Sequence, residues 1–124
     1  MKAINLQAAA MAAGVLTAAT IGVAAAPDAQ AALSYGSIAY ADNGAGASTW
    51  NYPSRSDAQQ AAVLYCGYSS CEVLTTFTDC GVVLYDSSTR ILQGAHGPTL
   101  SSAIAAARTA VPNGYVDSWA CNTV

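Results

Sequence analysis

The stretch GSIAYADN at residues 36–43 returns in a related form as GVVLYDSS at residues 81–88. Each copy begins with a glycine, continues through apolar positions, and reaches a tyrosine and then an aspartate. A short run of apolar and aromatic residues bounded by turn-forming residues is typical of a β-strand. The repetition therefore predicts that one supersecondary unit occurs twice in this chain.

A polar and aromatic stretch follows each copy, at residues 47–52 and 90–96, and a proline then introduces an Ala-rich segment. The first Ala-rich segment is predicted to be a helix because Ser54 and Asp57 resemble a capping box and Gly67 is a typical C-terminal stop. Positions i, i+3, i+4 and i+7 place a set of residues on one face of this helix: Ala58, Ala61, Ala62 and Tyr65.

The second Ala-rich segment is predicted to be a helix that begins at Pro98 and Thr99 and ends at Pro112. Strands are expected after the two helices, at residues 71–78 and 115–120, so each half is strand, strand, helix, strand. Short connections between successive strands favour antiparallel pairing. We therefore expect an α+β fold, a duplicated strand-strand-helix-strand repeat with a largely antiparallel sheet, two helices and disulfide staples. The second helix repeats the apolar spacing of the first with Leu100, Ala103, Ile104 and Ala107.

The four cysteines allow three connectivities, and the strand prediction discriminates among them. If residues 72–79 are extended at about 3.3 Å per residue, the Cα atoms of Cys71 and Cys80 lie about 30 Å apart, far beyond the ~7 Å that a disulfide spans. Pairing Cys66 with Cys80 fails in the same way, because Cys66 lies just before Cys71. The predicted bridges are Cys66 to Cys71 and Cys80 to Cys121. We expect the second bridge to join matching ends of the last strand of each half and so to tie the halves together.

The composition favours one compact domain and excludes several classes of protein. Of 124 residues, 53% are hydrophobic and 9% are charged, with four Lys plus Arg against seven Asp plus Glu. So few basic residues in an acidic chain cannot form the cationic surface that nucleic-acid binding needs. The high apolar fraction and low charge are the opposite of the composition that is typical of disordered chains. After residue 31 the chain contains no lysine, which excludes Schiff-base and P-loop chemistry.

Residues 1–31 have the layout of a secretory signal peptide. Lys2 precedes a long run of apolar and small residues, and Ala29-Gln30-Ala31 forms an A-x-A cleavage site. Residues 8–26 are close to the length of a transmembrane helix, but the run is mostly alanine and Pro27 follows it. The signal peptide is therefore the preferred interpretation.

Cleavage after Ala31 would leave a single mature domain at residues 32–124, with repeat halves at about 34–80 and 81–122. All four cysteines lie in this part, and disulfides persist in oxidising compartments outside the cytosol. We expect a secreted protein of the extracellular space or cell envelope, with no stable membrane span once the signal peptide is removed.

A set of residues concentrated in the first repeat matches a family pattern: Gly36, Ile38, Ala39, Tyr40, Asn51, Pro53, Ser54, Ala58, Ala61, Ala62, Cys66, Gly67, Cys71, Val73, Phe77, Cys80 and Gly81. The chain resembles the small exported actinobacterial proteins classed as domain of unknown function 4189, over nearly all of residues 34–121. The resemblance implies an exported, duplicated, disulfide-containing domain, and it implies no catalytic or ligand residue. The second repeat departs from the pattern, with Val111 and an Asn113-Gly114 turn where a second helix-end cysteine pair would be expected.

His96 is the only histidine and the candidate for acid/base chemistry. It could form a hydrolase set with Asp86 and a serine, but no G-x-S-x-G elbow accompanies it. Asp79, Asp86 and Asp117 could be glycosidase carboxylates, yet each ends or interrupts a predicted strand, where aspartate ordinarily forms turns. One histidine and a C-x4-C spacing provide too few ligands for tetrahedral zinc. We expect no metal and no cofactor.

Aromatic side chains are the other candidates for binding. Trp50 and Tyr52 alternate along one segment, so we expect them to share a sheet face and, if exposed, to form a contact patch. If they are buried, they are part of the core between sheet and helix. Trp119, beside Cys121, is expected in the core.

These observations favour a non-catalytic binding module with an unidentified protein or cell-envelope partner. Two alternatives stay open. One is a small secreted hydrolase that uses His96 with Asp86, and the other is an enzyme inhibitor that presents the loop from Gly94 to Thr99.

Overall fold

The computed structural model describes residues 33–123, so the predicted signal peptide at residues 1–31 lies outside the described residues. The elements follow one another along the chain as strand, strand, helix, strand, and then repeat in the same order. They are β2 (Tyr35–Tyr40), β3 (Gly46–Tyr52), α3 (Arg55–Cys66), β4 (Glu72–Phe77), β5 (Cys80–Asp86), β6 (Ile91–Gly97), α4 (Leu100–Arg108) and β7 (Tyr115–Cys121).

The strands form two three-stranded antiparallel sheets, one for each copy of the repeat. The first sheet has the order β3-β2-β4 and the second has the order β6-β5-β7. The predicted α+β class, the duplication and the antiparallel pairing are confirmed. The strand order, which the sequence left open, puts the first strand of each copy in the centre of its sheet.

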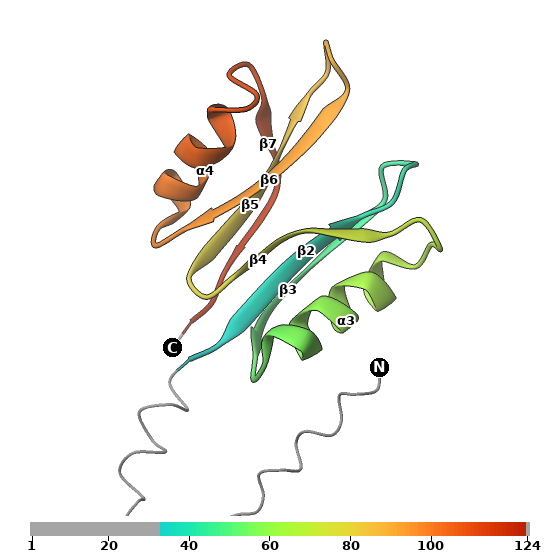
Figure 1. Cartoon of the computed structure of the whole chain (residues 1–124), viewed down its shortest axis with the longest axis vertical. Helices are drawn as coiled ribbons and strands as arrows, with labels where there is room; N and C mark the ends of the chain where they lie inside the picture. The colour runs from blue at the N-terminus through green and yellow to red at the C-terminus, as the bar shows by residue number, and fades with distance from the viewer. Residues whose placement is uncertain (1–32, 124) are drawn as a thin grey trace, which may run out of the picture. The chain divides into compact units, whose positions relative to one another are not determined.

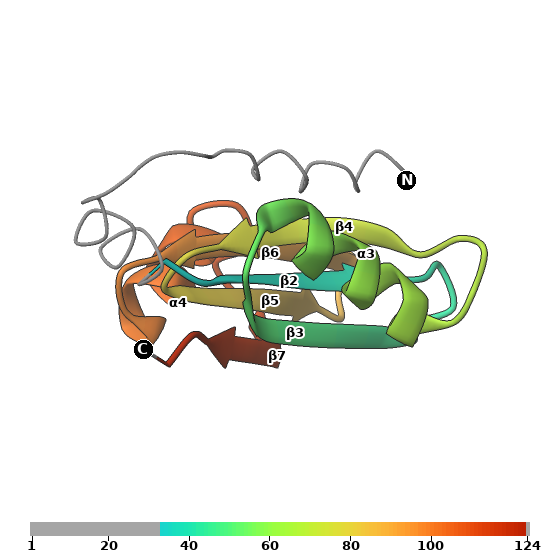
Figure 2. The same cartoon turned by 90° about the horizontal axis from the view of Figure 1, so that it is seen from below.

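The two sheets lie face to face, and each is covered on its outer side by its own helix (Figure 1). Figure 2 shows β4 aligned with β6, β2 with β5, and β3 with β7. A sheet with apolar residues on both sides must bury both. Each sheet does so by placing one face against its helix and the other against the second sheet.

Three clusters of buried apolar side chains follow from this layering. The alternation of β2 sends Ile38 and Tyr40 toward the second sheet and Ala39 toward α3. The alternation of β5 sends Val83 toward the first sheet and Val82 toward α4. The central strands therefore bury both of their faces, which is why their apolar runs are nearly continuous.

Packing explains why each copy of the repeat begins with a glycine. A Cβ atom on Gly36 or on Gly81 would overlap the ring of Phe77, which is buried between the sheets. The ring thus lies against the backbone of the central strand of both sheets. The repeated glycine, seen first as a sequence pattern, is what lets one phenylalanine fill this position.

The helices begin where the sequence predicts. The Ser54 side chain accepts a hydrogen bond from the Asp57 N–H at the start of α3, and Gly67 ends that helix with φ of 84°. The expected buried face is partly wrong, because the side chain of Tyr65 is exposed and Cys66 takes its place beside Ala58 and Ala62. Neither helix in residues 33–123 is long and apolar enough to cross a membrane.

Both predicted disulfides are present, Cys66 to Cys71 and Cys80 to Cys121. The expected role of the second bridge is wrong. Cys80 is the first residue of β5 and is paired directly with Cys121 of β7, at a Cα–Cα distance of 4.0 Å. The bridge therefore joins neighbouring strands within the second sheet and does not tie the two halves together.

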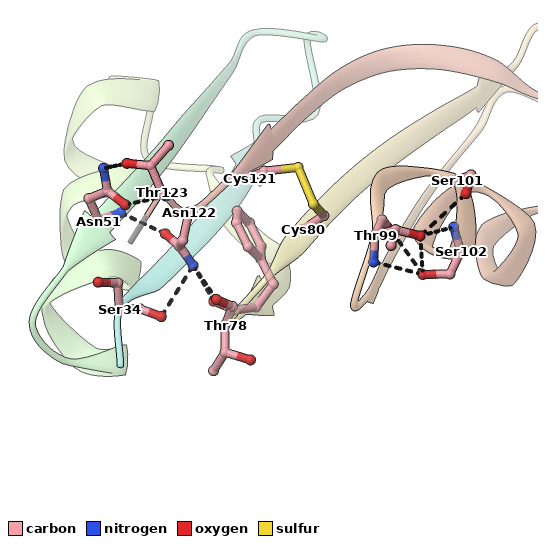
Figure 3. Close-up of a disulfide and its surroundings, with 11 residues drawn as sticks. Ser34, Asn51, Thr78, Cys80, Thr99, Ser101, Ser102, Cys121, Asn122 and Thr123 are labelled. Carbon is pink, nitrogen blue, oxygen red and sulfur yellow. Dashed lines mark hydrogen bonds between the residues drawn. A yellow bond between two sulfur atoms is a disulfide. The ribbon is translucent and has the colours of Figure 1, made fainter. Parts of the chain in front are cut away.

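Asn122, next to this bridge, makes hydrogen bonds from the second half to the first half (Figure 3). Its side-chain amide donates to the carbonyl groups of Ser34 (3.2 Å), Phe77 (3.3 Å) and Thr78 (2.8 Å) in the first half. Its side-chain oxygen accepts from the Asn51 N–H (2.6 Å). Asn122 thus links the end of β7 to β3, to the start of β2 and to the end of β4.

Candidate ligand-binding pocket

The expected contact patch of Trp50 and Tyr52 is divided by a β-bulge. β3 pairs with β2 through Thr49 and through Tyr52, but the two β3 residues between them face one residue of β2. Asn51, in this bulge, has φ of 63°. The extra residue reverses the alternation, so Tyr52 faces α3 while Trp50 points to the opposite side.

Two observations agree with this division. Tyr52 lies against Tyr65 of α3, and the hydrogen bond between them raises the pKa of Tyr52. Trp50 is 51% exposed. The prediction that Trp50 and Tyr52 share a face is therefore wrong, and Trp50 stays a predicted contact residue without Tyr52 beside it.

Trp119 is 52% exposed, so the expectation that it lies in the core is wrong. It is paired with Val82 and points to the α4 side of the second sheet. Helix α4 lies mainly over β5 and β6 and touches β7 less, so Trp119 on this edge strand stays half exposed.

His96 and Asp86 lie far apart along the hairpin of β5 and β6. His96 is paired with Gly81, five positions before Asp86 on the same strand, which places the two side chains about 16 Å apart along the strand. Asp86 accepts hydrogen bonds from the Ser88 N–H (2.9 Å) and hydroxyl (2.7 Å), and the hydroxyl bond lowers the pKa of Asp86. Asp86 therefore stabilises a turn, as expected, and the hydrolase set of His96 with Asp86 is wrong.

The segment from Gly94 to Thr99 is not an exposed loop. Its first part belongs to β6 and pairs with β5, and Thr99 is the N-cap of α4. The Thr99 side chain accepts from the Ser102 N–H (3.1 Å), and Ser102 completes a capping box. The expected loop is therefore wrong, because most of this segment belongs to a strand and Thr99 caps a helix, and the inhibitor alternative stays a prediction.

The turns of the β2–β3 hairpin and the β5–β6 hairpin lie at the same end of the two sheets (Figure 1). Residues of both hairpins and of β7 line a pocket of about 400 Å³. We call it the hairpin-end pocket. Its walls come from both copies of the repeat and contain aromatic rings, two carboxylates and one guanidinium group. They are Tyr40, Asp42, Asn43, Gly44, Tyr85, Arg90, Leu92, Tyr115 and Asp117.

A hydrogen-bonded group among the residues that line this pocket joins the two sheets. The Tyr40 hydroxyl of β2 donates to Oδ2 of Asp117 on β7 and lies 2.8 Å from the Ser118 hydroxyl. Burial raises the pKa of Tyr40 to about 12, and the hydrogen bond to Asp117 adds to the shift. Tyr40 therefore keeps its proton at neutral pH. The expectation that Asp117 forms a turn is wrong, because it lies at a bulge inside β7.

The first disulfide supports one wall of the pocket. Ser70 lies in the loop closed by Cys66 and Cys71, and its hydroxyl donates to Oδ1 of Asp42 (2.9 Å) and accepts from the Asp42 N–H (3.1 Å). The staple thereby positions a carboxylate that lines the pocket.

Arg90 lines the opposite hairpin with a backbone angle that is unusual for a residue with a side chain. Its φ is 61°, in the left-handed region that costs a non-glycine residue about 1 kcal/mol or more. Tyr85 and Tyr115 stand beside it in an edge-to-face arrangement, with ring centroids 5.8 Å apart. A guanidinium group and two rings are thus presented together.

The pocket was missed at the level of sequence, although one signal for it was present. Tyr40 and Tyr85 hold the same position in the two copies of the repeat, and the fold brings both to one pocket. The other wall residues belong to turns and to a bulge, which gave no distinct pattern. Within residues 33–123, no group of three or more His, Cys, Asp or Glu side chains could hold a metal ion.

Comparison with known proteins finds similar chains in mycobacteria. Protein Rv1269c of Mycobacterium tuberculosis is 50% identical over 94 residues, which are 76% of this chain and 74% of that protein. Uncharacterized protein Rv1813c of the same organism is 38% identical over 90 residues, which are 73% of this chain and 62% of that protein.

The NMR structure of Rv1813c is similar to this structure, with a TM-score of 0.62 and 38% sequence identity, over 72% of this chain and 75% of that chain. A family model described as "Domain of unknown function (DUF4189)" matches residues 35–124, which is most of the chain. The chain therefore belongs to the DUF4189 family.

Proposed function

We propose that this protein is exported, with cleavage after Ala31, and that its domain is a non-catalytic binding module whose ligand site is the hairpin-end pocket. Two disulfides support an oxidising, extracytoplasmic location. The observation that supports binding is the pocket itself, in which donors, acceptors and aromatic rings from both halves converge. A volume of about 400 Å³ lies within the usual range for small-molecule sites.

The chemistry of the walls favours binding over catalysis. In the part of the chain that the structure describes, no histidine, cysteine or lysine lines the pocket. Tyr40 is a poor general base, because its pKa is about 12 and its proton is held by Asp117. His96 lies on β6 opposite Gly81 of β5. Gly81 is four positions along β5 from Tyr85, which lines the pocket, so His96 lies about 13 Å along the strand from that residue.

The binding proposal is tested by NMR with the oxidised, isotope-labelled full chain and a library of polar small molecules covering neutral, cationic and anionic groups. We expect at least one class of compound to shift the amide signals of residues 42–44 and 115–117 together and saturably. A Tyr115→Ala variant should weaken this response, whereas Tyr68→Ala should not. Tyr68 is a suitable control because it is 55% exposed, against 53% for Tyr115, and lies outside the pocket. If no compound shifts these amides, the binding proposal is wrong.

Export is tested separately. N-terminal sequencing of the protein recovered from the culture medium and from the cell-envelope fraction should begin at Ala32. Recovery of the uncleaved chain from the cytosol alone would refute export without bearing on the pocket.

A further inference from the structure

We infer that the ligand of the hairpin-end pocket is a neutral saccharide, held by hydroxyl hydrogen bonds to Asp42, Asp117 and Arg90 and by packing against Tyr115. This inference rests on the proposed binding function and specifies its ligand class. It follows from the combination of charges in the pocket, from the aromatic surface and from the backbone of Arg90.

The signs of the charges disfavour a charged ligand. An anion bound to Arg90 would face the carboxylates of Asp42 and Asp117, and a cation bound to those carboxylates would face the guanidinium group of Arg90. In either case repulsion would offset part of the attraction. A neutral hydroxyl group avoids this conflict, because it donates to a carboxylate and accepts from a guanidinium group.

The geometry of the polar groups suits a ligand with several hydroxyls. Carboxylates and guanidinium groups each offer two or more bonding positions in one plane, and adjacent sugar hydroxyls can engage both positions of one such group. Asp42 and Asp117 are held in place by hydrogen bonds to Ser70 and Tyr40, respectively. Because these acceptors are already oriented, little ordering of side chains is needed when the ligand binds.

The aromatic surface suits the apolar face of a sugar ring. Tyr115 is 53% exposed, and its orientation is supported by the edge-to-face contact with Tyr85. A pyranose ring has C–H groups on its faces and hydroxyls around its edge, so it can pack on a tyrosine ring while its hydroxyls reach polar walls. Leu92 adds an apolar wall to the same pocket.

Arg90 closes the turn between β5 and β6, where its N–H donates to the Asp86 carbonyl (2.7 Å). A glycine would adopt its φ of 61° at lower cost, so the presence of an arginine here is consistent with a role for its side chain. Arg90→Gly is therefore an informative variant: it removes the guanidinium group from the pocket while its backbone fits the turn, so the domain should stay folded.

The test uses NMR titration of the oxidised full chain with named probes. The neutral probes are maltose, cellobiose and N,N′-diacetylchitobiose, and the charged probes are glucuronate and tetramethylammonium. We expect at least one neutral disaccharide to shift the amides of residues 42–44 and 115–117 saturably. Tyr115→Ala and Arg90→Gly should each weaken that binding about tenfold. Tyr68→Ala and Arg108→Ala, which alter exposed residues outside the pocket, should leave it unchanged.

The outcomes separate this inference from the function on which it rests. If glucuronate, tetramethylammonium or another charged compound shifts the pocket amides and no neutral disaccharide does, the saccharide inference is overturned and the binding function stands. If a disaccharide binds but Tyr115→Ala and Arg90→Gly, both shown to be folded by their spectra, bind it as tightly as the parent chain, the inference is also overturned. If the pocket amides respond neither to these probes nor to the wider library, both proposals fail.

Discussion

Replacing Asn122 by alanine tests how much the hydrogen bonds of this side chain contribute to holding the two sheets together. The side chain makes four hydrogen bonds, three from its amide to carbonyl groups of the first half and one to its oxygen from Asn51. Two amide protons serve the three carbonyl groups, so about three full hydrogen bonds are lost, each worth about 1 kcal/mol net. Because part of this site is open to water, which can solvate the freed groups, we expect a loss of about 2 kcal/mol.

For a domain of this size, that loss corresponds to a fall in melting temperature of about 10 °C. The assay is thermal unfolding of the oxidised protein followed by circular dichroism. Mass analysis without reductant should show that the adjacent bridge of Cys80 and Cys121 still forms in the variant. Asn113→Ala, at an exposed position in the turn before β7, is the matched control and should change the melting temperature by about 2 °C or less.

A melting temperature for Asn122→Ala that is no lower than that of Asn113→Ala would refute this reasoning. It would mean that the apolar contacts and the Tyr40–Asp117 hydrogen bond suffice to hold the sheets together, and that the Asn122 hydrogen bonds seen in Figure 3 contribute nothing measurable. Hydrogen exchange gives a second readout, because the amide of Asn51 donates directly to Asn122 and should exchange faster in the variant.

Three further predictions concern stability. Cys121→Ala should lower the melting temperature about 10 °C more than Cys66→Ala in parallel thermal melts. The bridge of Cys121 closes a loop with a sequence separation of 41, and that of Cys66 closes one of 5. By chain entropy the longer loop contributes about 4 kcal/mol to the free energy of unfolding and the shorter one about 2 kcal/mol. Thr75→Val should stabilise the domain by about 1 kcal/mol in urea unfolding, since its buried hydroxyl has no hydrogen-bond partner in the described part of the chain, whereas Thr49→Val should destabilise it because that hydroxyl bonds to backbone groups. The pKa of Tyr40 is about 12 in the folded protein and 10.0 ordinarily, so the stability that this shift contributes is complete below pH 10 and is lost as the pH rises toward 12. Over this interval the melting temperature of Tyr40→Phe should therefore fall less steeply with pH than that of the parent protein. Equal slopes for the two proteins would contradict this assignment.

Much of the fold could be predicted because its signals are local. The paired stretches at residues 36–43 and 81–88 identify the central strands, although both strands end earlier than expected. β2 ends at Tyr40 because a turn follows, in which Gly44 adopts φ of 92° and its N–H donates to the Ala41 carbonyl (3.1 Å). Because turn-forming residues follow directly on the apolar run, the sequence alone did not show where the strand ends and the turn begins.

The candidate site was less predictable, because its residues meet only through packing. Trp50 and Tyr52 are two residues apart, and strict alternation would put them on one face. A single extra residue at Asn51 reverses that alternation, and a bulge has no reliable sequence pattern. The sequence predicts a turn at Asp117 for the same reason. Its actual role depends on a second bulge and on Tyr40 from the other sheet.

The amino-acid sequence by itself determined the type and order of the elements, the duplication and the pairing of the cysteines. These features depend on periodicity, caps and chain reach, which are properties of neighbouring residues. Tertiary structure alone decided that each half forms its own sheet, that Cys80 and Cys121 lie on adjacent strands of one sheet, and that Tyr40, Arg90, Tyr115 and Asp117 line one pocket. The physical reason is that strand partners and stacked sheets are chosen by burial of apolar faces between distant segments, and no short stretch of sequence records that choice.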